Sequence, residues 1–218
     1  MPQVTAISPQ KKKSGRFNLF LDGKFALGIE GETLLASGLK IGRVLSGEEI
    51  SKIIKKEQGT KLLDLATNFL SFRPRSEKEV RDYLIKKIST RENIKFSEAR
   101  ESPLIDQVIE KLARYKYLND LEFAKWFMAS RTSSHPKGLA LIKLELKRKG
   151  ITQEIIDKVS ASSSNERDLA RRAVEKKVKR WQNLPVLEFK KKFYQYLASR
   201  GFDFDTIRET FAFFTKKS

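Results

Sequence analysis

The sequence predicts a mainly α-helical protein, in which three three-helix units form an elongated, curved tandem array after a small N-terminal segment with a β-hairpin. Three observations carry this prediction. An Asp-Gly pair separates two apolar runs near the N-terminus, apolar residues then recur at helical spacing, and one short motif appears twice, 51 residues apart. Repeated units that pack only against their neighbours form elongated arrays.

The N-terminal segment is predicted to be β structure. Val4 to Ile7 is a short apolar run, and the runs Arg16 to Leu21 and Phe25 to Ile29 flank Asp22-Gly23-Lys24. Asp-Gly is the strongest short hairpin signal because Gly tolerates the positive φ of a tight turn. We therefore expect a hairpin, preceded by an exposed basic loop from Lys11 to Gly15.

The pattern becomes helical after Glu32, and Ser46 with Glu49 predicts a capping box ahead of an apolar helix. From Lys61 onward the sequence predicts nine helices. We expect the N-terminal segment at 1–58 and the three-helix units at 59–117, 118–162 and 163–218. The predicted helices are Lys61–Phe72, Ser76–Ile88 and Pro103–Tyr115 in unit one, Asp120–Arg131, Pro136–Lys149 and Thr152–Ser160 in unit two, and Glu166–Trp181, Pro185–Arg200 and Asp203–Phe214 in unit three.

A helix-ending motif supports the division into units. Leu146 to Thr152 and Leu197 to Asp203 share a Leu, a basic residue, a Gly, a hydrophobe and a capping residue in register. The Gly ends one helix in the left-handed conformation, the hydrophobe folds back on the last turn, and the Thr or Asp caps the next helix. Leu84 to Ile88 holds this place in unit one without the Gly, and a charged insertion, Ser89 to Ser102, follows it.

Apolar stripes at helical spacing predict which faces are buried. In unit two, Phe123 and Phe127 have the i,i+4 spacing of core residues, not of a base-stacking platform. Asn119 or Asp120 caps that helix, and we expect Tyr117 and Leu118 to anchor its entry. The stripes of the outer units consist of Leu104, Ile105, Val108, Ile109 and Leu112 in unit one and Phe204, Ile207, Phe211 and Phe214 in unit three.

The composition excludes several classes of chemistry. The chain has no Cys, which removes disulfides, thiolate nucleophiles and every Cys-based metal site. Its single His135, expected at the surface, has no partners for a metal site, and capping explains the paired carboxylates Asp203 and Asp205. No Gly-rich phosphate-binding loop is present. We therefore expect no enzyme, no metal and no cofactor.

The charge predicts an anionic partner. The chain has 45 Lys and Arg residues against 27 Asp and Glu residues, a net charge of +18, and the surplus is greatest in residues 165–218, at +7. Nucleic acid is the simplest such partner, and a distributed surplus suits a protein that follows a long charged object. The longest charge-free run, Met1 to Gln10, is too short for a spanning helix. We expect a soluble, cytoplasmic monomer without membrane contact.

Most of the basic residues with a candidate binding role fall into three clusters, and Arg131 and Lys143 lie outside them. Arg73 and Arg75 sit at a predicted helix junction, either as bidentate donors for phosphate or carboxylate or as solvated residues of a capped turn. Lys147 to Lys149 end a helix, where the helix dipole explains them equally well. The helix Glu166–Trp181 carries a basic face that only Glu175 interrupts and that Lys190 to Lys192 extend, and here a binding role is favoured. The candidate residues are Arg73, Arg75, Arg131, Lys143, Lys147, Arg148, Lys149, Arg171, Arg172, Lys176, Lys179 and Arg180.

The order and spacing of these motifs resemble the RecX family of RecA regulators. The stretch from Val4 to Glu30 is similar to the N-terminal extension of its longer members. The sequence departs from the family at Ile88, where Gly often closes the helix, and in the size of the insertion Ser89 to Ser102. The motifs that carry the resemblance are Arg73 to Glu79, Leu84 to Lys87, Tyr117 to Asp120 with Phe123-Ala124, Arg131, Gly138, and Leu146 to Ile151.

The resemblance implies a cytoplasmic modulator of the RecA recombinase, built from tandem three-helix repeats, that lies in the groove of the RecA–DNA filament. There it restrains ATP hydrolysis, strand exchange and the co-protease activity that triggers the SOS response. Some members of the family also bind single- or double-stranded DNA themselves.

The sequence keeps one alternative open, a sequence-specific DNA-binding repressor. The stretch from Lys137 to Ser160 has the form of a helix-turn-helix. Such readers normally use two-fold symmetry, and the sequence offers no heptad or dimerisation segment to provide it.

Overall fold

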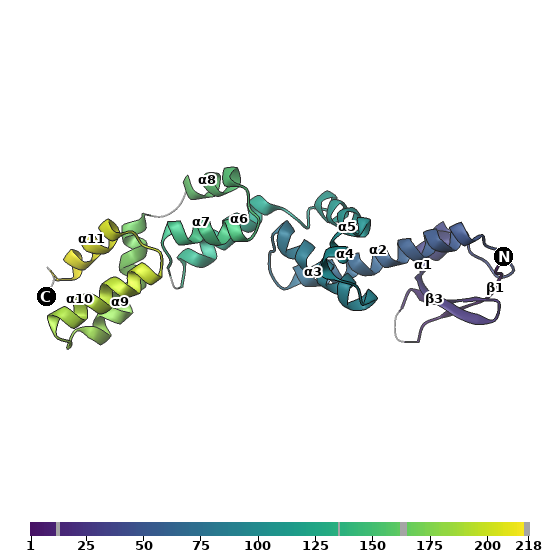
Figure 1. Ribbon diagram of the computed structural model, residues 1–218, viewed down its shortest axis with the longest axis horizontal. Helices are drawn as coiled ribbons and strands as arrows, with labels where there is room; N and C mark the ends of the chain where they lie inside the picture. The colour runs from purple at the N-terminus through teal and green to yellow at the C-terminus, as the bar shows by residue number, and fades with distance from the viewer. Residues whose placement is uncertain (12–13, 135, 162–164, 216–218) are drawn as a thin grey trace. The chain divides into compact units, whose positions relative to one another are not determined.

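The computed structural model describes residues 1–11, 14–134, 136–161 and 165–215, so the predictions for His135 and for part of the basic loop lie outside the described residues. In the described part, three short strands come first and all later elements, α1 to α11, are helices (Figure 1). The predicted mainly α-helical fold is therefore confirmed. None of these helices is both long and apolar enough to cross a membrane. The elements are β1 (Val4–Pro9), β2 (Arg16–Leu21), β3 (Lys24–Glu30), α1 (Gly31–Ala36), α2 (Gly47–Ser71), α3 (Glu77–Glu92), α4 (Phe96–Arg100), α5 (Pro103–Arg114), α6 (Asp120–Thr132), α7 (Leu139–Arg148), α8 (Gln153–Ala161), α9 (Glu166–Trp181), α10 (Val186–Ser199) and α11 (Phe204–Thr215).

The chain divides into two compact units, which we describe separately. The first compact unit contains residues Met1–Phe72 and Arg81–Tyr117, and the second contains Arg73–Val80 and the chain from Leu118 onward. The first turn of α3 therefore belongs to the second compact unit, whereas the remainder of this helix belongs to the first.

The N-terminal sheet has the strand order β1-β2-β3, and both strand pairs are antiparallel. Leu21 lies opposite Lys24, so Asp22 and Gly23 alone form the hairpin turn. Their φ values of +47° and +78° are those that a tight hairpin turn requires, which confirms the predicted hairpin. One face of the sheet is buried, with Leu19 and Ile29 in a cluster that includes Ile53 of α2.

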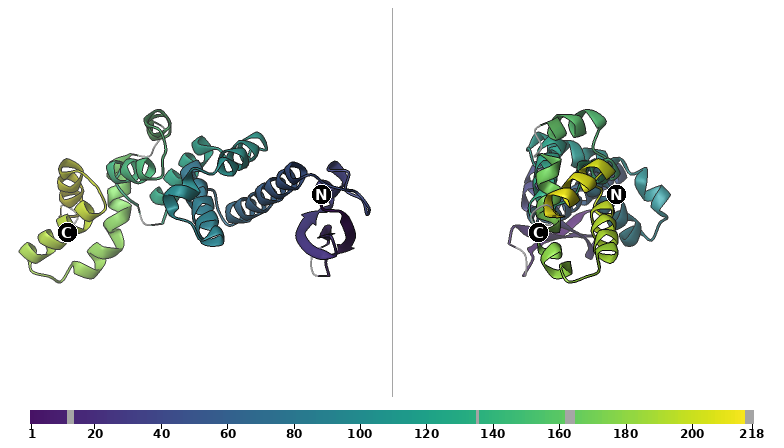
Figure 2. Two further views of the ribbon diagram at one scale, coloured as in Figure 1. Left: turned by 45° about the vertical axis from the view of Figure 1, so that its right-hand side comes forward. Right: turned by 90° about the vertical axis from the view of Figure 1, so that its left-hand side faces the viewer.

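Helix α2 begins at Gly47, where Ser46 and Glu49 form the predicted capping box. It continues without a break to Ser71 (Figure 2), so the predicted start of a new helix at Lys61 is wrong. The polar stretch before Lys61 stays helical because Glu57, only 2% exposed, is satisfied by long-range contacts. Its carboxylate accepts hydrogen bonds from Arg16 Nη2 at 3.1 Å and from the backbone N–H of Glu30 at 3.0 Å.

The first compact unit also contains α3 from Arg81 onward, α4 and α5. Helix α3 continues to Glu92, four residues beyond its predicted end, and the insertion that follows contains the short α4. Helix α5 packs against α2 (Figure 1). This contact buries most of the predicted stripe of α5. Leu104, at the start of that stripe, is half-buried.

The second compact unit has two apolar clusters, one under α6 to α8 and one under α9 to α11. Gly150 and Gly201 have φ values of +84° and +82°. Ile151 and Phe202, which follow them, are 3% and 5% exposed and donate their N–H groups to the carbonyls of the Leu residues five positions earlier. Both copies of the predicted helix-ending motif are therefore confirmed.

Three predictions for α6, α7 and α11 are wrong. Pro136 does not start α7, because Gly138 is its N-cap. Phe204 is 65% exposed, since it precedes the buried part of the α11 stripe. Tyr117 is 60% exposed and does not anchor α6, whose N-cap Asn119 accepts hydrogen bonds from the N–H groups of Leu121 and Glu122. The prediction that Phe123 and Phe127 are core residues is confirmed by their exposures of 1% and 5%.

Candidate functional site

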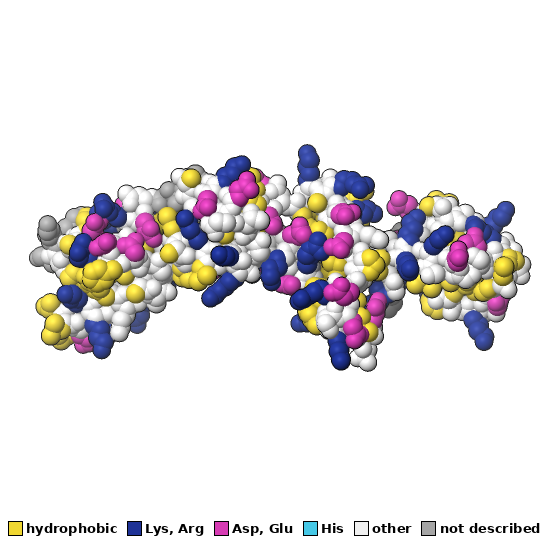
Figure 3. Space-filling model, turned by 45° about the horizontal axis from the view of Figure 1, so that its top comes forward, with side chains coloured by type: hydrophobic (Ala, Val, Ile, Leu, Met, Phe, Trp, Pro, Cys, Tyr) yellow, Lys and Arg dark blue, Asp and Glu magenta, His cyan; other side chains and the backbone are white. Residues whose placement is uncertain are grey.

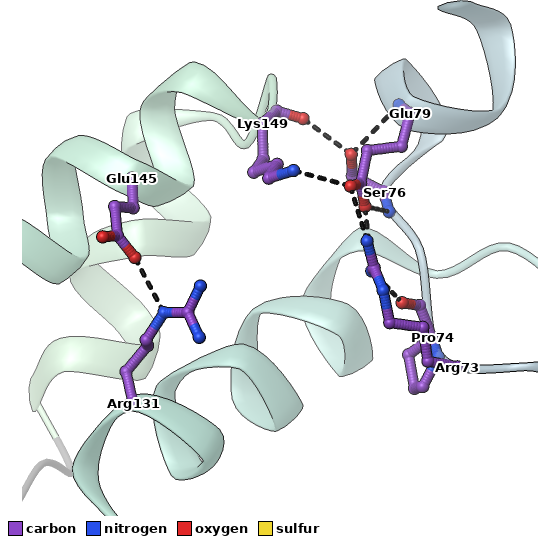
Figure 4. A network of polar contacts seen from close by, with 7 residues as sticks. All are labelled: Arg73, Pro74, Ser76, Glu79, Arg131, Glu145 and Lys149. Atoms are coloured by element: carbon purple, nitrogen blue, oxygen red, sulfur yellow. Dashed lines mark hydrogen bonds and ion pairs between the residues drawn. The ribbon is translucent and has the colours of Figure 1, made fainter. Parts of the chain in front are cut away.

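A carboxylate at the start of α3 binds two of the candidate cations (Figure 4). Glu79 accepts hydrogen bonds from Arg73 Nη2 at 2.9 Å and Nη1 at 3.2 Å, and from Lys149 Nζ at 2.6 Å. The guanidinium of Arg73 also lies 5.7 Å from the ring centroid of Trp126. Arg73 is therefore a bidentate donor, as predicted for this type of residue, but its acceptor here is the chain's own carboxylate.

These cations control the ionisation of Glu79. Partial burial raises the pKa of its carboxyl group, but the hydrogen bonds and charges of Arg73 and Lys149 outweigh burial and lower the pKa to about 2. Arg75, half-buried next to this group, has a lowered pKa because of its own burial and the charge of Arg73.

Backbone contacts join the same segment to α6 and α7. The Ser76 hydroxyl caps α3 by accepting from Glu79 N–H at 3.2 Å and donates to the Lys149 carbonyl oxygen at 2.7 Å. The Glu77 N–H donates to Asp120 Oδ1 at 2.8 Å. We call the contacts of Arg73, Ser76 and Glu79 with Lys149 the polar junction (Figure 4).

A second junction within the same compact unit joins the start of α7 to the end of α10. The Gly138 N–H donates to the Arg200 carbonyl oxygen at 2.9 Å, and a Cβ atom on Gly138 would overlap the backbone of Gly201. A Cβ atom on Gly201 would in turn overlap Leu141. We call these contacts of Gly138, Leu141 and Gly201 the glycine junction. Only glycine permits this approach of the two backbones.

Arg131 also has an acceptor within the chain. Its Nε donates to Glu145 Oε2 at 2.8 Å, and Lys137 binds the other oxygen of the same carboxylate. Burial raises the pKa of Glu145, but the hydrogen bonds from Lys137 and Arg131 outweigh it and lower the pKa. The Arg131 guanidinium lies 4.5 Å from the ring centroid of Phe127, so this side chain also packs on the apolar cluster of α6.

The remaining candidates on α7 face solvent to different degrees. Lys147 and Arg148 are exposed in its last turn, whereas Lys143 is half-buried. The cations at the helix end interact favourably with the partial negative charge of the last carbonyls. Lys147 and Arg148 remain available to an anionic partner.

The predicted basic face of α9 is present in the structure. Arg172, Lys176 and Lys179 follow one another at i, i+4 and i+7 and are exposed, as is Arg180. Arg172 donates a hydrogen bond to the carbonyl oxygen of Thr132. Arg171 differs, because its guanidinium lies 4.1 Å from the ring centroid of Phe213. The exposed α9 cations present one positive face, which suits phosphate groups.

Positive charge is distributed along the whole chain. The face drawn in Figure 3 shows Lys and Arg side chains rising from every part of the chain, with Asp and Glu side chains among them. Among the described residues, no group of three or more His, Asp or Glu side chains has the arrangement of a metal site.

The structure brings together residues that sequence reasoning kept apart. Arg73 and Lys149 share one carboxylate, although they belonged to separate predicted clusters. In the sequence, Glu79 was marked only as the last residue of the motif Arg73 to Glu79, and no local pattern marked Glu145 as the acceptor for Arg131. The distance in sequence between Glu79 and Lys149 explains why this pairing was missed.

Family models match the chain in four places. They are described as the regulatory protein RecX N-terminal domain at residues 2–46, and the RecX first, second and third three-helix domains at 63–90, 119–159 and 165–211. The four matches follow the order of the N-terminal sheet and the three groups of helices.

Curated relatives agree with this match. The regulatory protein RecX of Bacillus subtilis strain 168 is 38% identical over 210 residues, which cover 95% of this chain and 75% of the relative. The regulatory protein RecX of Listeria monocytogenes serotype 4b (strain F2365) is 39% identical over 167 residues, which cover 77% of this chain and 58% of the relative.

Two crystal structures have a similar fold. A structure of the regulatory protein RecX superposes with a TM-score of 0.68 at 23% identity, covering 96% of this chain and 98% of the other. The structure of RecX from Lactobacillus salivarius has a TM-score of 0.56 at 24% identity, covering 72% and 96% of the two chains. From the extent of the sequence matches, the chain belongs to the RecX family of regulatory proteins.

Proposed function

We propose that this chain regulates a RecA recombinase: it binds the RecA–DNA filament and restrains ATP hydrolysis, strand exchange and co-protease activity, with no catalysis of its own. The observation that carries the proposal is family membership across the sheet and all three groups of helices. It acts in the cytoplasm and as a monomer in this proposal.

The exposed cations of α7 and α9 support a polyanionic partner. Lys147, Arg148, Lys176, Lys179 and Arg180 are exposed, and none of them forms an ion pair with a residue in the described part of the chain. In the proposal they contact DNA phosphates or acidic groups of the filament. Arg73, Arg131 and Lys149 already have carboxylate partners, so in this proposal they hold the helices that present the exposed cations.

The test is the rate of single-strand-DNA-stimulated ATP hydrolysis by RecA as this protein is titrated in at fixed low salt. We expect the rate to fall. Inhibition well below one copy per RecA indicates an effect on filament growth or persistence, whereas inhibition only near saturation indicates that the protein occupies the filament groove. An unchanged rate at every ratio contradicts the proposal.

A charge-reversed variant tests the contribution of α9. In Lys176→Glu/Lys179→Glu/Arg180→Glu, we expect weaker inhibition and a salt dependence whose log–log slope falls by about 2 to 3, because phosphate contacts release counterions. The matched control is Lys24→Glu/Lys40→Glu/Lys158→Glu, which changes the net charge equally at exposed positions outside this face. Equal loss of inhibition in both variants would show that α9 is not part of the contact surface.

The DNA-binding repressor remains the second candidate because a short turn joins α7 to α8 and the last turn of α7 carries the exposed cations Lys147 and Arg148. Footprinting on genomic fragments separates the two functions. A discrete protected site on the DNA indicates the repressor. A filament regulator is expected to give diffuse protection or none.

A further inference from the structure

The first compact unit contains a groove along α2 and α5 that none of the candidate residues lines. Its volume is about 750 Å³. Four cations line it, Lys55 and Lys56 of α2, Arg91 of α3 and Lys111 of α5, against the single acid Glu92. All four cations are exposed, and none forms an ion pair with a described residue. We call this the cationic groove, and its charge suits phosphate groups.

The cationic groove contains a glycine that the fold does not require. Gly59 lies in the middle of α2, where Gly destabilises a helix relative to Ala. Its φ is not positive, and a Cβ atom there would meet only Leu104 Cδ2, at the ordinary contact distance of 3.9 Å. A side chain at this position would instead take up space in the groove, so Gly59 keeps the groove open.

A second groove adjoins the first at Leu63, which lines both. It has a volume of about 430 Å³, and Tyr115 and Tyr117 line it together with Asp64 and Thr67 of α2. The two tyrosine side chains are 57% and 60% exposed. Exposed aromatic rings beside cations are the elements with which proteins stack unpaired bases. We call this the tyrosine groove.

The turn that holds these tyrosines departs from its counterparts in the second compact unit. The Lys116 N–H donates to the Ala113 carbonyl and the Tyr117 N–H to the Leu112 carbonyl, both at 2.9 Å, which is the same helix-ending motif as at Gly150 and Gly201. Lys116 adopts a φ of +61°, where glycine is favoured.

The residue after this position also differs. Ile151 and Phe202 bury their side chains against the helix they follow, whereas Tyr117 leaves its ring in solvent. A glycine followed by a buried hydrophobe would serve the fold better. A lysine and an exposed ring at these two positions therefore indicate a ligand rather than packing.

We propose that the single-strand binding implied by the family resemblance has its site in the first compact unit, where an unpaired base stacks on Tyr115 or Tyr117 and the adjoining phosphates lie in the cationic groove. On α2, Lys56, Gly59, Leu63 and Thr67 follow helical spacing on one face, so the two grooves extend over about 16 Å of this helix. This length exceeds one nucleotide, and the site therefore binds a strand rather than a mononucleotide.

Charge fixes which part of the ligand enters which groove. Asp64 in the tyrosine groove repels phosphate, but its carboxylate can accept a hydrogen bond from a base N–H group. Lys55, Lys56 and Lys111 attract phosphate. The base therefore enters the tyrosine groove and the backbone follows the cationic groove. A duplex, whose bases are stacked on each other, cannot place a base between the tyrosines and Asp64.

The test measures binding by fluorescence anisotropy without RecA, so its result is independent of the proposed function. The probes are labelled oligo(dT), an abasic strand of equal length and a duplex of equal length. The intact protein is expected to bind oligo(dT) about 5- to 150-fold more tightly than the abasic strand, the contribution of one stacked base. Equal affinity for oligo(dT) and the abasic strand would overturn the proposal.

Paired substitutions locate the stacking site. Tyr115→Ala/Tyr117→Ala should bind oligo(dT) and the abasic strand equally, whereas Tyr115→Phe/Tyr117→Phe should keep the preference because both rings remain. The matched control, Phe72→Ala/Phe204→Ala, removes two other exposed rings, 77% and 65% exposed, and should bind as the intact protein does. Retained preference in the Tyr→Ala pair contradicts the proposal.

Gly59→Gln provides a test that a folding defect cannot explain. Gln is a better helix former than Gly, so the variant should melt at a higher temperature than the intact protein. Its side chain should fill part of the cationic groove and weaken binding of oligo(dT) and the abasic strand alike. Unchanged binding would exclude the cationic groove as the phosphate site. Photocrosslinking of a 5-iodouracil strand to Tyr115 or Tyr117, read by mass spectrometry, would place the base directly.

Discussion

The polar junction and the glycine junction solve the same structural problem with different chemistry. In each, the N-terminus of one helix meets the C-terminal turn of another: α3 meets α7 at Lys149, and α7 meets α10 at Gly201. In each case an acidic side chain of the next helix group accepts a hydrogen bond from a backbone N–H group. Asp120 accepts from Glu77 beside the polar junction, and Glu166 accepts from Leu139 beside the glycine junction.

The two junctions differ in what holds them. The polar junction depends on a carboxylate between two cations, and the glycine junction on the close approach of two backbones. The comparison shows that a repeated contact can keep its geometry while its sensitivity to solvent conditions changes. The polar junction should respond to pH and salt, and the glycine junction to the volume of one methyl group.

The largest effect is expected for Gly138→Ala. The added Cβ would overlap the Gly201 carbonyl, and neither backbone can move without displacing a helix end. We expect a loss of about 3 kcal/mol in the free energy of unfolding, measured by urea denaturation. Gly47→Ala, also at a helix start but with no atom within 4 Å of the added Cβ, is the matched control and should change stability little. Equal effects in both variants would contradict the steric account.

Glu79→Gln should destabilise the polar junction by about 2 kcal/mol at pH 7, because it leaves Arg73 and Lys149 facing each other without a charge between them. The free energy of unfolding of the variant and the intact protein gives the value. Glu122→Gln, in an exposed pair with Lys125, is the control and should have a much smaller effect.

The intact protein and Glu79→Gln should also differ in how the free energy of unfolding depends on pH. Folding lowers the pKa of Glu79 from 4.5 to about 2, so its stabilising contribution is complete above the unfolded value and is lost as the pH falls from about 5 toward 2. The stability difference between the intact protein and Glu79→Gln should shrink over this range. A constant difference from pH 7 to pH 3 would show that the carboxylate charge does not hold the junction.

Lys149→Ala should cost about 0.5 to 1 kcal/mol, because its side chain is 36% exposed and solvent screens the pair with Glu79. The cost should fall further at about 1 M salt, where charge interactions are screened within about 3 Å. Unfolding midpoints at low and high salt measure the difference. Gly138→Ala serves as the contrast, since its cost should not depend on salt.

The smallest effect concerns the turn at Lys116, which has the conformation of Gly150 and Gly201 without their glycine. Lys116→Gly should stabilise the protein by about 0.5 kcal/mol, as the relief of left-handed strain exceeds the greater flexibility of glycine in the unfolded chain. Urea midpoints detect this increase. A decrease would show that the Lys116 side chain has stabilising contacts.

Local signals in the sequence were sufficient for much of the fold. The Asp22-Gly23 turn, the Ser46 capping box and the motif that ends at Gly150 each involve neighbouring residues, and each was predicted correctly. The continuity of α2 past Lys61 was not predicted, because Glu57 is held by Arg16 across 41 positions. The start of α7 was missed because Gly138 is fixed by its approach to Gly201.

The candidate site was harder to predict, because its side chains also bind partners that lie far away in the sequence. The sequence identified exposed cations on α9 from helical spacing alone. It could not show that Arg73 and Lys149 are neutralised by one carboxylate, because Lys149 lies 70 positions from Glu79. Tyr117 was predicted to anchor a helix entry, since nothing local in the sequence distinguishes a buried from an exposed tyrosine at this position.

The buried contact between Arg16 and Glu57 limits how the chain can be shortened. A fragment that starts after the hairpin would keep Glu57 but lose its cation, and an uncompensated carboxylate at such a buried position costs about 3 to 5 kcal/mol. A cut at residue 58 or 59 would also divide α2. Deletion studies of this protein should therefore either retain β1 to β3 or replace Glu57 with an apolar residue. Transplanting the three-helix groups into another protein requires the same precaution.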